Sequence, residues 1–238
     1  GVMNTDNMAI SGETIDYGPC AFMDHYNPKT VFSSIDQLGR YSFSNQPPIT
    51  KWNLSRFAEC LIPLIDKNED KAIQLATEII DNFQNIYEEK WLNMMRDKLG
   101  LFGKSKDDKK LIDDLLTWME KNKADYTNTF CYLMNVKIGN NSLYDDKEFI
   151  NWSKNWKNRI SINDNSKEKS LELMKETNPI IIPRNHKVEE ALKAANKDNL
   201  EVMNKLLSKF NNPYGEQKGI EDYQLPSLDD NYQTFCGT

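Results

Sequence analysis

Asp6, Asn7 and Asp16 lie within the first 16 positions of the chain. Asp6 and Asn7 are adjacent, and Asp16 opens an Asp-Tyr-Gly triplet. A hard divalent cation prefers oxygen ligands, and carboxylate and amide oxygens supply them without a competing proton at neutral pH. A second carboxylate can orient or deprotonate an attacking hydroxyl. The three side chains therefore have the chemistry of a site for magnesium and a nucleotide.

The order of these residues is close to that of protein kinases, with one departure. Kinases carry an Asp and an Asn on the catalytic loop and a metal-binding Asp in a later Asp-Phe-Gly. Here Asp6 and Asn7 are neighbours, and no His-Arg-Asp triplet precedes them. Because the same residue types also form exposed turns, a plain turn is the alternative. Apolar residues before and between them, at positions 2–3 and 15, favour two short buried strands that end in the polar residues.

Blocks along the whole chain resemble the selenoprotein O family, the YdiU group of bacteria. The first block is Gly-Val-Met-Asn-Thr-Asp-Asn-Met at 1–8, followed by Thr-Ile-Asp-Tyr-Gly-Pro at 14–19. Others lie at 32–36, 39–41, 45–48, 52–54, 125–130, 178–179, 182–186 and 234–238. The resemblance covers the C-terminal half of that family only.

This resemblance implies a kinase-like fold and a protein adenylyltransferase, which binds ATP in an inverted pose and transfers AMP to Ser, Thr or Tyr hydroxyls of proteins. Carried over position by position, Asp6 is expected as the proton acceptor. Asn7 and Asp16 are expected to hold the metal, and Asp16 also to lie against the nucleotide phosphates. The implied metal is Mg²⁺, with Mn²⁺ as the alternative. Attack at the α-phosphorus needs a metal to neutralise developing charge and a carboxylate near the incoming hydroxyl.

The family's glycine-rich nucleotide loop, ion-paired lysine and phosphate-binding arginines have no counterpart here, and the sequence contains no Gly-x-Gly-x-x-Gly. We therefore expect the chain to begin inside the catalytic loop, as a C-terminal fragment. Alone it is expected to be inactive and to bind ATP weakly or not at all. The expected partners are ATP, protein substrates with Ser, Thr or Tyr hydroxyls, and the missing N-terminal lobe.

Four cysteines, at positions 20, 60, 131 and 236, are far apart and show no metal-type spacing. Cys60 and Cys131 stand among apolar residues in helical patterns, which predicts buried thiols. The resemblance implies that Cys236, in a Cys-Gly-Thr ending, is redox-active, and Cys20 beside the metal loop is its expected partner. Phe32 stands where some relatives have a partner cysteine.

The charge balance argues against a nucleic-acid-binding protein. Lys and Arg number 30 against 36 Asp and Glu, for a net charge of −6, whereas such proteins usually carry a basic face. No apolar run approaches the roughly 20 residues that span a bilayer, so no membrane partner is expected. The expected location is the cytoplasm in a bacterial protein and the mitochondrion in a eukaryotic one.

Apolar residues recur every three to four positions through most of the chain after Lys51, which predicts helices. Ser105 is expected to cap one helix, and the Asp125 block is predicted to be a cap and packing element. Trp152 and Trp156, four apart, are predicted to lie in the core. The expected helices cover 51–65, 69–99, 111–119, 125–134, 145–159, 166–176, 187–196 and 200–210.

The expected fold class is mainly α, the helical C-lobe of a protein-kinase-like fold with a small β element at the metal loop. We expect one structural domain in three segments. Residues 1–50 are the metal loop and the loop after it, 51–211 the helical lobe, and 212–238 a tail with the redox cysteine. The resemblance also implies that Arg184 and His186 brace the active-site loops.

Two classes of function are consistent with these residues. The first is the metal-dependent AMP transfer described above, with redox regulation through Cys236. Within it, UMP transfer from UTP with manganese, or phosphate transfer, is a narrower alternative. The second class is a non-catalytic helical module that binds or regulates a partner.

Overall fold

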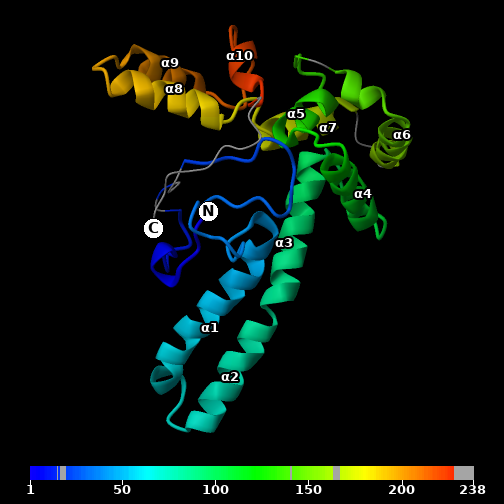
Figure 1. The fold of residues 1–238 in the computed structure, drawn as a ribbon. Coiled ribbons are helices and arrows are strands. Elements are labelled where there is room, and N and C mark those ends of the chain that lie inside the picture. Colours follow the sequence, from blue (N-terminus) through cyan, green and yellow to red (C-terminus); the bar gives the residue numbers. More distant parts are fainter. Residues whose placement is uncertain (15, 17–19, 140, 163–166, 228–238) are drawn as a thin grey trace. The chain divides into compact units, whose positions relative to one another are not determined.

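The computed structural model describes residues 1–14, 16, 20–139, 141–162 and 167–227 (Figure 1). This part of the chain is mainly helical, as expected. The longer helices are α1 (Gln46–Ile65), α2 (Glu69–Asp81), α3 (Phe83–Lys98), α4 (Asp108–Lys121), α5 (Tyr126–Leu133), α6 (Lys147–Ser161), α7 (Lys167–Thr177), α8 (Asn185–Ala195) and α9 (Glu201–Phe210). Shorter turns of helix are η1 (Thr5–Asn7), η2 (Phe43–Asn45), η3 (Ser142–Asp145) and α10 (Glu221–Gln224).

The predicted pair of strands at the metal loop is wrong for the residues that the structure describes. They contain no strand, and their one isolated β-bridge joins His25 to Asp125. The carbonyl of Met3 accepts a hydrogen bond from the Asn53 side chain on α1, at 2.9 Å, instead of from a neighbouring strand. The chain then curls into η1, which ends any extended run. Ile15, the other strand position, lies outside the described residues.

The chain forms two compact units, and the expected single domain of segments 1–50, 51–211 and 212–238 stays a prediction. Among the described residues, the first unit holds 1–14, 16 and 28–92. The second holds 20–27 and 93–227, with the gaps given above. The boundary at 92/93 falls inside α3, so helix boundaries predicted from periodicity could not reveal it.

Two helix boundaries differ from the prediction for local reasons. α1 begins at Gln46, before Lys51, because Pro47 and Pro48 occupy its first turn, where a missing N–H costs nothing. The predicted run 69–99 is two helices, α2 and α3, separated at Asn82. At the end of α3, Gly100 has φ +66°, and a Cβ there would lie 2.6 Å from the carbonyl oxygen of Ser170. Only glycine fits that position.

The second unit has an aromatic core around α4 and α6. Trp118, Phe149, Trp152 and Trp156 are all buried, which confirms the core assignment of the last two tryptophans. Trp152 Nε1 donates to the Leu111 carbonyl at 2.8 Å, and Trp156 Nε1 donates to the Leu99 carbonyl at 2.9 Å. Both buried indole N–H groups therefore have a hydrogen-bond acceptor.

Whether a cysteine is buried depends on how much of its helix is packed against other elements. Cys131 on α5 is buried, as predicted, but Cys60 on α1 is exposed. Within its own unit α1 contacts α2 and η2, so part of its surface has no helix against it. Apolar neighbours in the sequence were therefore a misleading guide for Cys60. No helix in the described part of the chain combines the length and the apolar character needed to cross a bilayer.

A buried carboxylate joins three helices of the second unit. Asp107, not Ser105, precedes α4, and Asp108 in the first turn is fully buried. Its oxygens accept from Arg96 Nε at 2.6 Å, Arg159 Nε at 2.7 Å and the Ser105 amide at 2.9 Å. Burial by itself would raise the pKa of Asp108, but these hydrogen bonds and the positive charge of Arg159 outweigh it and lower the pKa.

We expect Asp108→Asn to destabilise the chain by about 3–5 kcal/mol, because two buried arginines would lose their shared anion. The lowered pKa means that Asp108 stabilises the fold above its unfolded pKa of about 3.9 and stops doing so as pH falls through the folded pKa. Urea unfolding followed by circular dichroism should therefore show a gap between wild type and variant at pH 7 that shrinks below about pH 4.

Asp114→Asn is the matched control, since Asp114 pairs with Lys110 on the exposed side of the same helix. It should leave the unfolding midpoint nearly unchanged. Equal effects of the two variants would contradict a structural role specific to Asp108.

Candidate functional site

Asp6 and Asn7 lie side by side on η1, and both are exposed. The turn is closed by a hydrogen bond from the Asn7 amide to the Asn4 carbonyl, at 3.0 Å. The Asn7 side chain donates through Nδ2 to the Val2 carbonyl at 3.0 Å. This bond uses the NH₂ group, so the amide oxygen, the atom that a cation would take, is not consumed by it.

The loop that carries these residues is held by the first unit through its backbone and its flanking side chains. Asn53 on α1, only 5% exposed, donates through Nδ2 to the Met3 carbonyl and contacts Met8 Sδ at 2.8 Å. The Tyr41 hydroxyl donates to the side-chain oxygen of Asn4. The anchors lie on both sides of η1, so the turn is positioned while Asp6 and Asn7 stay exposed.

Asp16 is also exposed, and the rest of its triplet, Tyr17 and Gly18, lies outside the described residues. Two exposed carboxylates and one amide oxygen are the donor set that suits a hard cation such as Mg²⁺. Among the described residues, no three His, Cys, Asp or Glu side chains form a metal cluster. The predicted metal site has two carboxylates, Asp6 and Asp16, and one amide, Asn7, so it does not contain three residues of these types. Its donor chemistry fits magnesium, and its coordination stays a prediction.

Cys20, the expected redox partner, is half-buried and has φ +48°. Burial raises the pKa of its thiol, which lowers the fraction of reactive thiolate at neutral pH. Cys236 lies outside the described residues, so the Cys20–Cys236 pairing stays a prediction.

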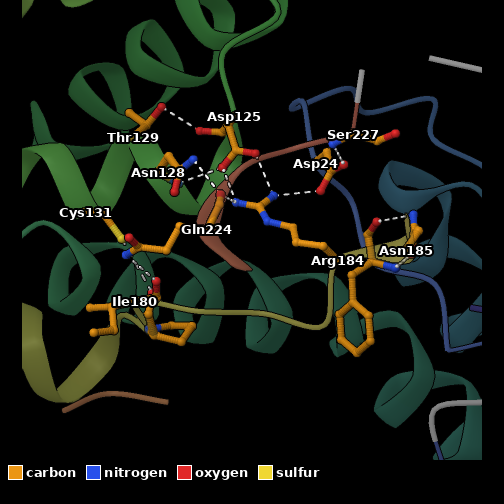
Figure 2. A network of polar contacts seen from close by, with 12 residues as sticks. Asp24, Asp125, Asn128, Thr129, Cys131, Ile180, Arg184, Asn185, Gln224 and Ser227 are labelled. Atoms are coloured by element: carbon orange, nitrogen blue, oxygen red, sulfur yellow. Dashed lines mark hydrogen bonds and ion pairs between the residues drawn. The ribbon is translucent and has the colours of Figure 1, made fainter. Parts of the chain in front are cut away.

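The second unit contains a buried polar network around Arg184 (Figure 2). Arg184 is 1% exposed, and Nη1 donates to Asp24 Oδ1 and to Asp125 Oδ2, each at 2.6 Å. Nη2 donates to Asp125 Oδ1 at 3.2 Å and to the Gln224 carbonyl at 2.7 Å. One guanidinium therefore joins three segments that are far apart in the sequence.

Backbone groups complete the Arg184 network. The Asn128 amide donates to Asp125 Oδ1 at 2.7 Å, which confirms Asp125 as the cap of α5. The Ser227 amide donates to Asp24 Oδ2 at 3.0 Å. The Gln224 side chain donates to the Ile180 carbonyl at 2.9 Å. Figure 2 shows Asp24 and Asp125 converging on the guanidinium from separate segments, with Ile180 further away.

The segment Cys20–Asn27, which follows the Asp16 triplet in sequence, is bound to the second unit at three points. Besides the Asp24 contacts, Asn185 pairs with the backbone of Phe22 in both directions, each bond 3.0 Å long. The Tyr26 amide donates to the Ala124 carbonyl at 2.9 Å, and the Tyr126 amide donates to the Asp24 carbonyl at 2.8 Å. Backbone groups of Phe22, Asp24 and Tyr26 are thus hydrogen-bonded although the segment is irregular.

The charges of the Arg184 network are unequal, with two carboxylates for one guanidinium. Burial would lower the pKa of Arg184, but Asp125 and Asp24 outweigh it and raise the pKa, so the guanidinium stays charged. Burial raises the pKa of Asp125 despite Arg184, and repulsion from Asp24 adds to the rise. Burial also lowers the pKa of His186, which favours the neutral ring.

The sequence indicated part of this network. It placed Arg184 as a brace and Asp125 as a cap, but it gave no partner for either. Asp24, Gln224 and Ser227 were not connected with them, because Asp24 and Arg184 are 160 positions apart. A polar pair at such a separation leaves no periodic signal in a single sequence.

Comparison with known proteins identifies the chain's relatives. The family model described as Protein adenylyltransferase SelO matches residues 1–211. The chain is 62% identical, along its whole length, to Protein nucleotidyltransferase YdiU of Pelagibacter ubique. It is 52% identical to the proteins of that name from Clostridium beijerinckii and Bacillus cereus (strain G9842). It covers 50% of the first relative and 49% of the other two, so the chain spans about half the length of these curated relatives.

The matches extend over the whole chain, and the family model includes the stretch with Asp6, Asn7 and Asp16 as well as Arg184. The chain therefore belongs to the SelO family, and the relatives named above are protein nucleotidyltransferases by name.

Proposed function

We propose that this chain is the C-terminal part of a protein adenylyltransferase, which transfers AMP from ATP to Ser, Thr or Tyr hydroxyls of proteins with Mg²⁺. One observation carries the proposal. The family match begins at residue 1, and the loop found there exposes Asp6 and Asn7 while its backbone is anchored to α1. An anchored loop with exposed oxygen groups suits a reaction centre, because reacting groups must be both positioned and accessible.

In this proposal Asp6 accepts the proton of the attacking hydroxyl. The hydroxyl oxygen bonds to the α-phosphorus, the bond from that phosphorus to the oxygen bridging to the β-phosphate breaks, and pyrophosphate leaves. Asn7 and Asp16 hold the metal, and Asp16 also lies against the phosphates. When bound, Mg²⁺ neutralises the charge that develops on the phosphate oxygens.

The geometry of η1 suits two different roles for adjacent residues. A 3₁₀ turn has three residues per turn, so consecutive side chains leave it about 120° apart. Asp6 can therefore face an incoming hydroxyl while Asn7 faces the metal. On an extended strand the two side chains would lie on opposite faces.

Redox regulation is a separate part of the proposal, in which Cys236 is the sensing thiol and Cys20 its partner. The raised pKa of Cys20 favours its role as the resolving thiol rather than the first to be oxidised, since oxidation follows thiolate character.

The first prediction from this function concerns the transferred group. A full-length protein is made by joining the remaining half of the Pelagibacter ubique relative to this chain. With Mg²⁺ and a protein acceptor, it should incorporate label from α-labelled ATP and none from γ-labelled ATP, because AMP keeps only the α-phosphate. The measurement is radiolabel in the protein band.

The 238-residue chain alone is the control and should transfer no label. Incorporation from the γ position would indicate phosphate transfer, and preference for α-labelled UTP with Mn²⁺ would indicate UMP transfer. No incorporation from any nucleotide would leave the non-catalytic helical module as the function.

The second prediction separates binding from proton transfer in the full-length protein. Asp16→Ala should abolish binding of ATP with Mg²⁺ in calorimetric titration, because a metal ligand and a phosphate contact are lost. Asp6→Ala should keep the affinity within about twofold and lower kcat by about 10²–10⁴-fold, the usual contribution of a general base.

Glu13→Ala is the matched control, since Glu13 is an exposed carboxylate in the same stretch. It should change neither quantity. Unchanged ATP affinity in Asp16→Ala would refute the metal assignment.

The third prediction concerns the Arg184 network as a brace. Asp24→Ala removes acceptors for Arg184 and for the Ser227 amide. Because bonds to charged groups contribute about 1.5–3 kcal/mol each, amide hydrogen exchange in residues 20–27 should speed up by about tenfold or more. Exchange in α4 and α6 should stay the same, as mass spectrometry of the 238-residue chain can measure.

Asp36→Ala provides the comparison, because the Asp36 carboxylate also accepts from two loop amides, those of Arg40 and Tyr41. It should leave residues 20–27 protected. If Asp24→Ala also leaves them protected, the Arg184 network does not brace this segment.

A further inference from the structure

The second unit contains a cavity of about 710 Å³ that the proposed reaction does not use. It lies between the end of α5, the segment that leads to η3, and helices α6 and α7. Its volume falls within the roughly 300–1,000 Å³ of small-molecule sites. None of Asp6, Asn7 and Asp16 lines it.

The inner walls of the cavity are apolar and closely packed. Tyr144, Phe149, Trp156 and Met174 are buried, and they line it together with the half-buried Tyr132. The Tyr132 and Tyr144 rings stack with centroids 4.0 Å apart. Ring contacts of this kind hold the wall in place without a ligand.

The polar atoms of the two buried wall rings that carry one, those of Trp156 and Tyr144, already have partners. The Trp156 indole N–H donates to the Leu99 carbonyl, and the Tyr144 hydroxyl lies 3.3 Å from the Thr129 hydroxyl. These groups therefore offer a ligand apolar surface rather than hydrogen bonds. Burial also raises the pKa of Tyr144 to about 12, so the wall carries no charge at neutral pH.

The charged residues that line the cavity are mostly cationic. Lys137, Lys157 and Lys167 come from three separate elements, and Asp145 is the single carboxylate among the lining residues. In the part of the chain that the structure describes, none of the three lysines has an ion pair within 4.0 Å.

Lysines of the neighbouring helix α4 behave differently. Lys109, Lys110 and Lys121 each pair with a carboxylate, at 2.6–2.7 Å. Among the described lining residues, three lysines thus stand against one carboxylate, Asp145, on a chain whose net charge is −6. Such a local excess of one sign over low-dielectric walls attracts the opposite ion.

We propose that this cavity binds a small amphipathic anion, with its apolar body against the ring walls and its anionic head among the three lysines. Burial of the apolar body supplies most of the affinity, and the lysines select charge and orientation. A cation would be repelled, and a neutral apolar molecule would leave the lysines without a counter-charge. A fatty acid and an aromatic carboxylate share the required chemistry.

The test is calorimetric titration of the 238-residue chain with two probes, laurate and 1-naphthoate, which distinguish an aliphatic from an aromatic body. At least one should bind with one-to-one stoichiometry, and more weakly as salt is raised. Lys157→Glu should weaken binding by about tenfold, because one nearby charge is reversed. Ser153→Trp should abolish binding by filling the cavity, since Ser153 lines it on α6.

Lys154→Glu is the matched control, an exposed lysine on α6 that does not line the cavity. It should bind the probe as wild type does, and so should Asp16→Ala, with circular dichroism confirming the fold of each variant. Failure of both probes to bind would overturn the proposal. So would equal weakening by the two lysine variants, unchanged binding in Ser153→Trp, or loss of binding in Asp16→Ala.

Discussion

The second unit depends on one buried guanidinium that serves two carboxylates. Arg184 is 1% exposed, and the side chains of Asp24 and Asp125 that it contacts are 14% and 7% exposed. One positive charge does not neutralise two negative ones, and oriented N–H groups help to stabilise the excess. The amides of Ser227 and Asn128 supply them, one for each carboxylate. The backbone at Ser227 and at Asn128 therefore has to lie beside the two carboxylates. These bonds connect segments that have little regular secondary structure.

The Arg184 network fixes the conformation of segments that lie largely outside helices and sheets. Residues 20–27, 180–184 and 224–227 are largely irregular, yet each gives the Arg184 network a group that the others need. A buried ion pair rarely adds much net stability, but removing one partner leaves an uncompensated charge, at a cost of several kcal/mol. The segments therefore order together. In this family member the irregular segment 20–27 is thereby tied to residues 224–227.

The sequence predicted what depends on local pattern and failed where distant partners decide. Helices followed from periodicity, and the side chains of Trp152 and Trp156 were placed in the core because their spacing matched a helix face. Asp6 and Asn7 were singled out by residue type, and the structure finds them on an exposed turn. The β element at the metal loop was wrong because Asn53, far away on α1, satisfies the Met3 carbonyl that a strand would have used. Cys60 was wrongly predicted to be buried, because which face of α1 packs against other elements depends on the tertiary structure. The coordination of Asp16 and the pairing of Cys236 stay predictions.

Atoms that bind or react cannot also be the atoms that hold the fold, since an atom committed to an internal partner is unavailable to a ligand; Asn7 bonds to the Val2 carbonyl through its NH₂ group and keeps its amide oxygen. On η1 the anchors are Asn53 and Tyr41, and the exposed residues are Asp6 and Asn7. The cavity beside α6 shows the same division of roles. The polar atoms of Trp156 and Tyr144 have hydrogen-bond partners within the protein, whereas the three lysines that line the cavity form no ion pair among the described residues. Solvent-exposed charge that forms no internal pair contributes little to stability. Three such lysines beside one apolar wall are the basis for the proposed anion site.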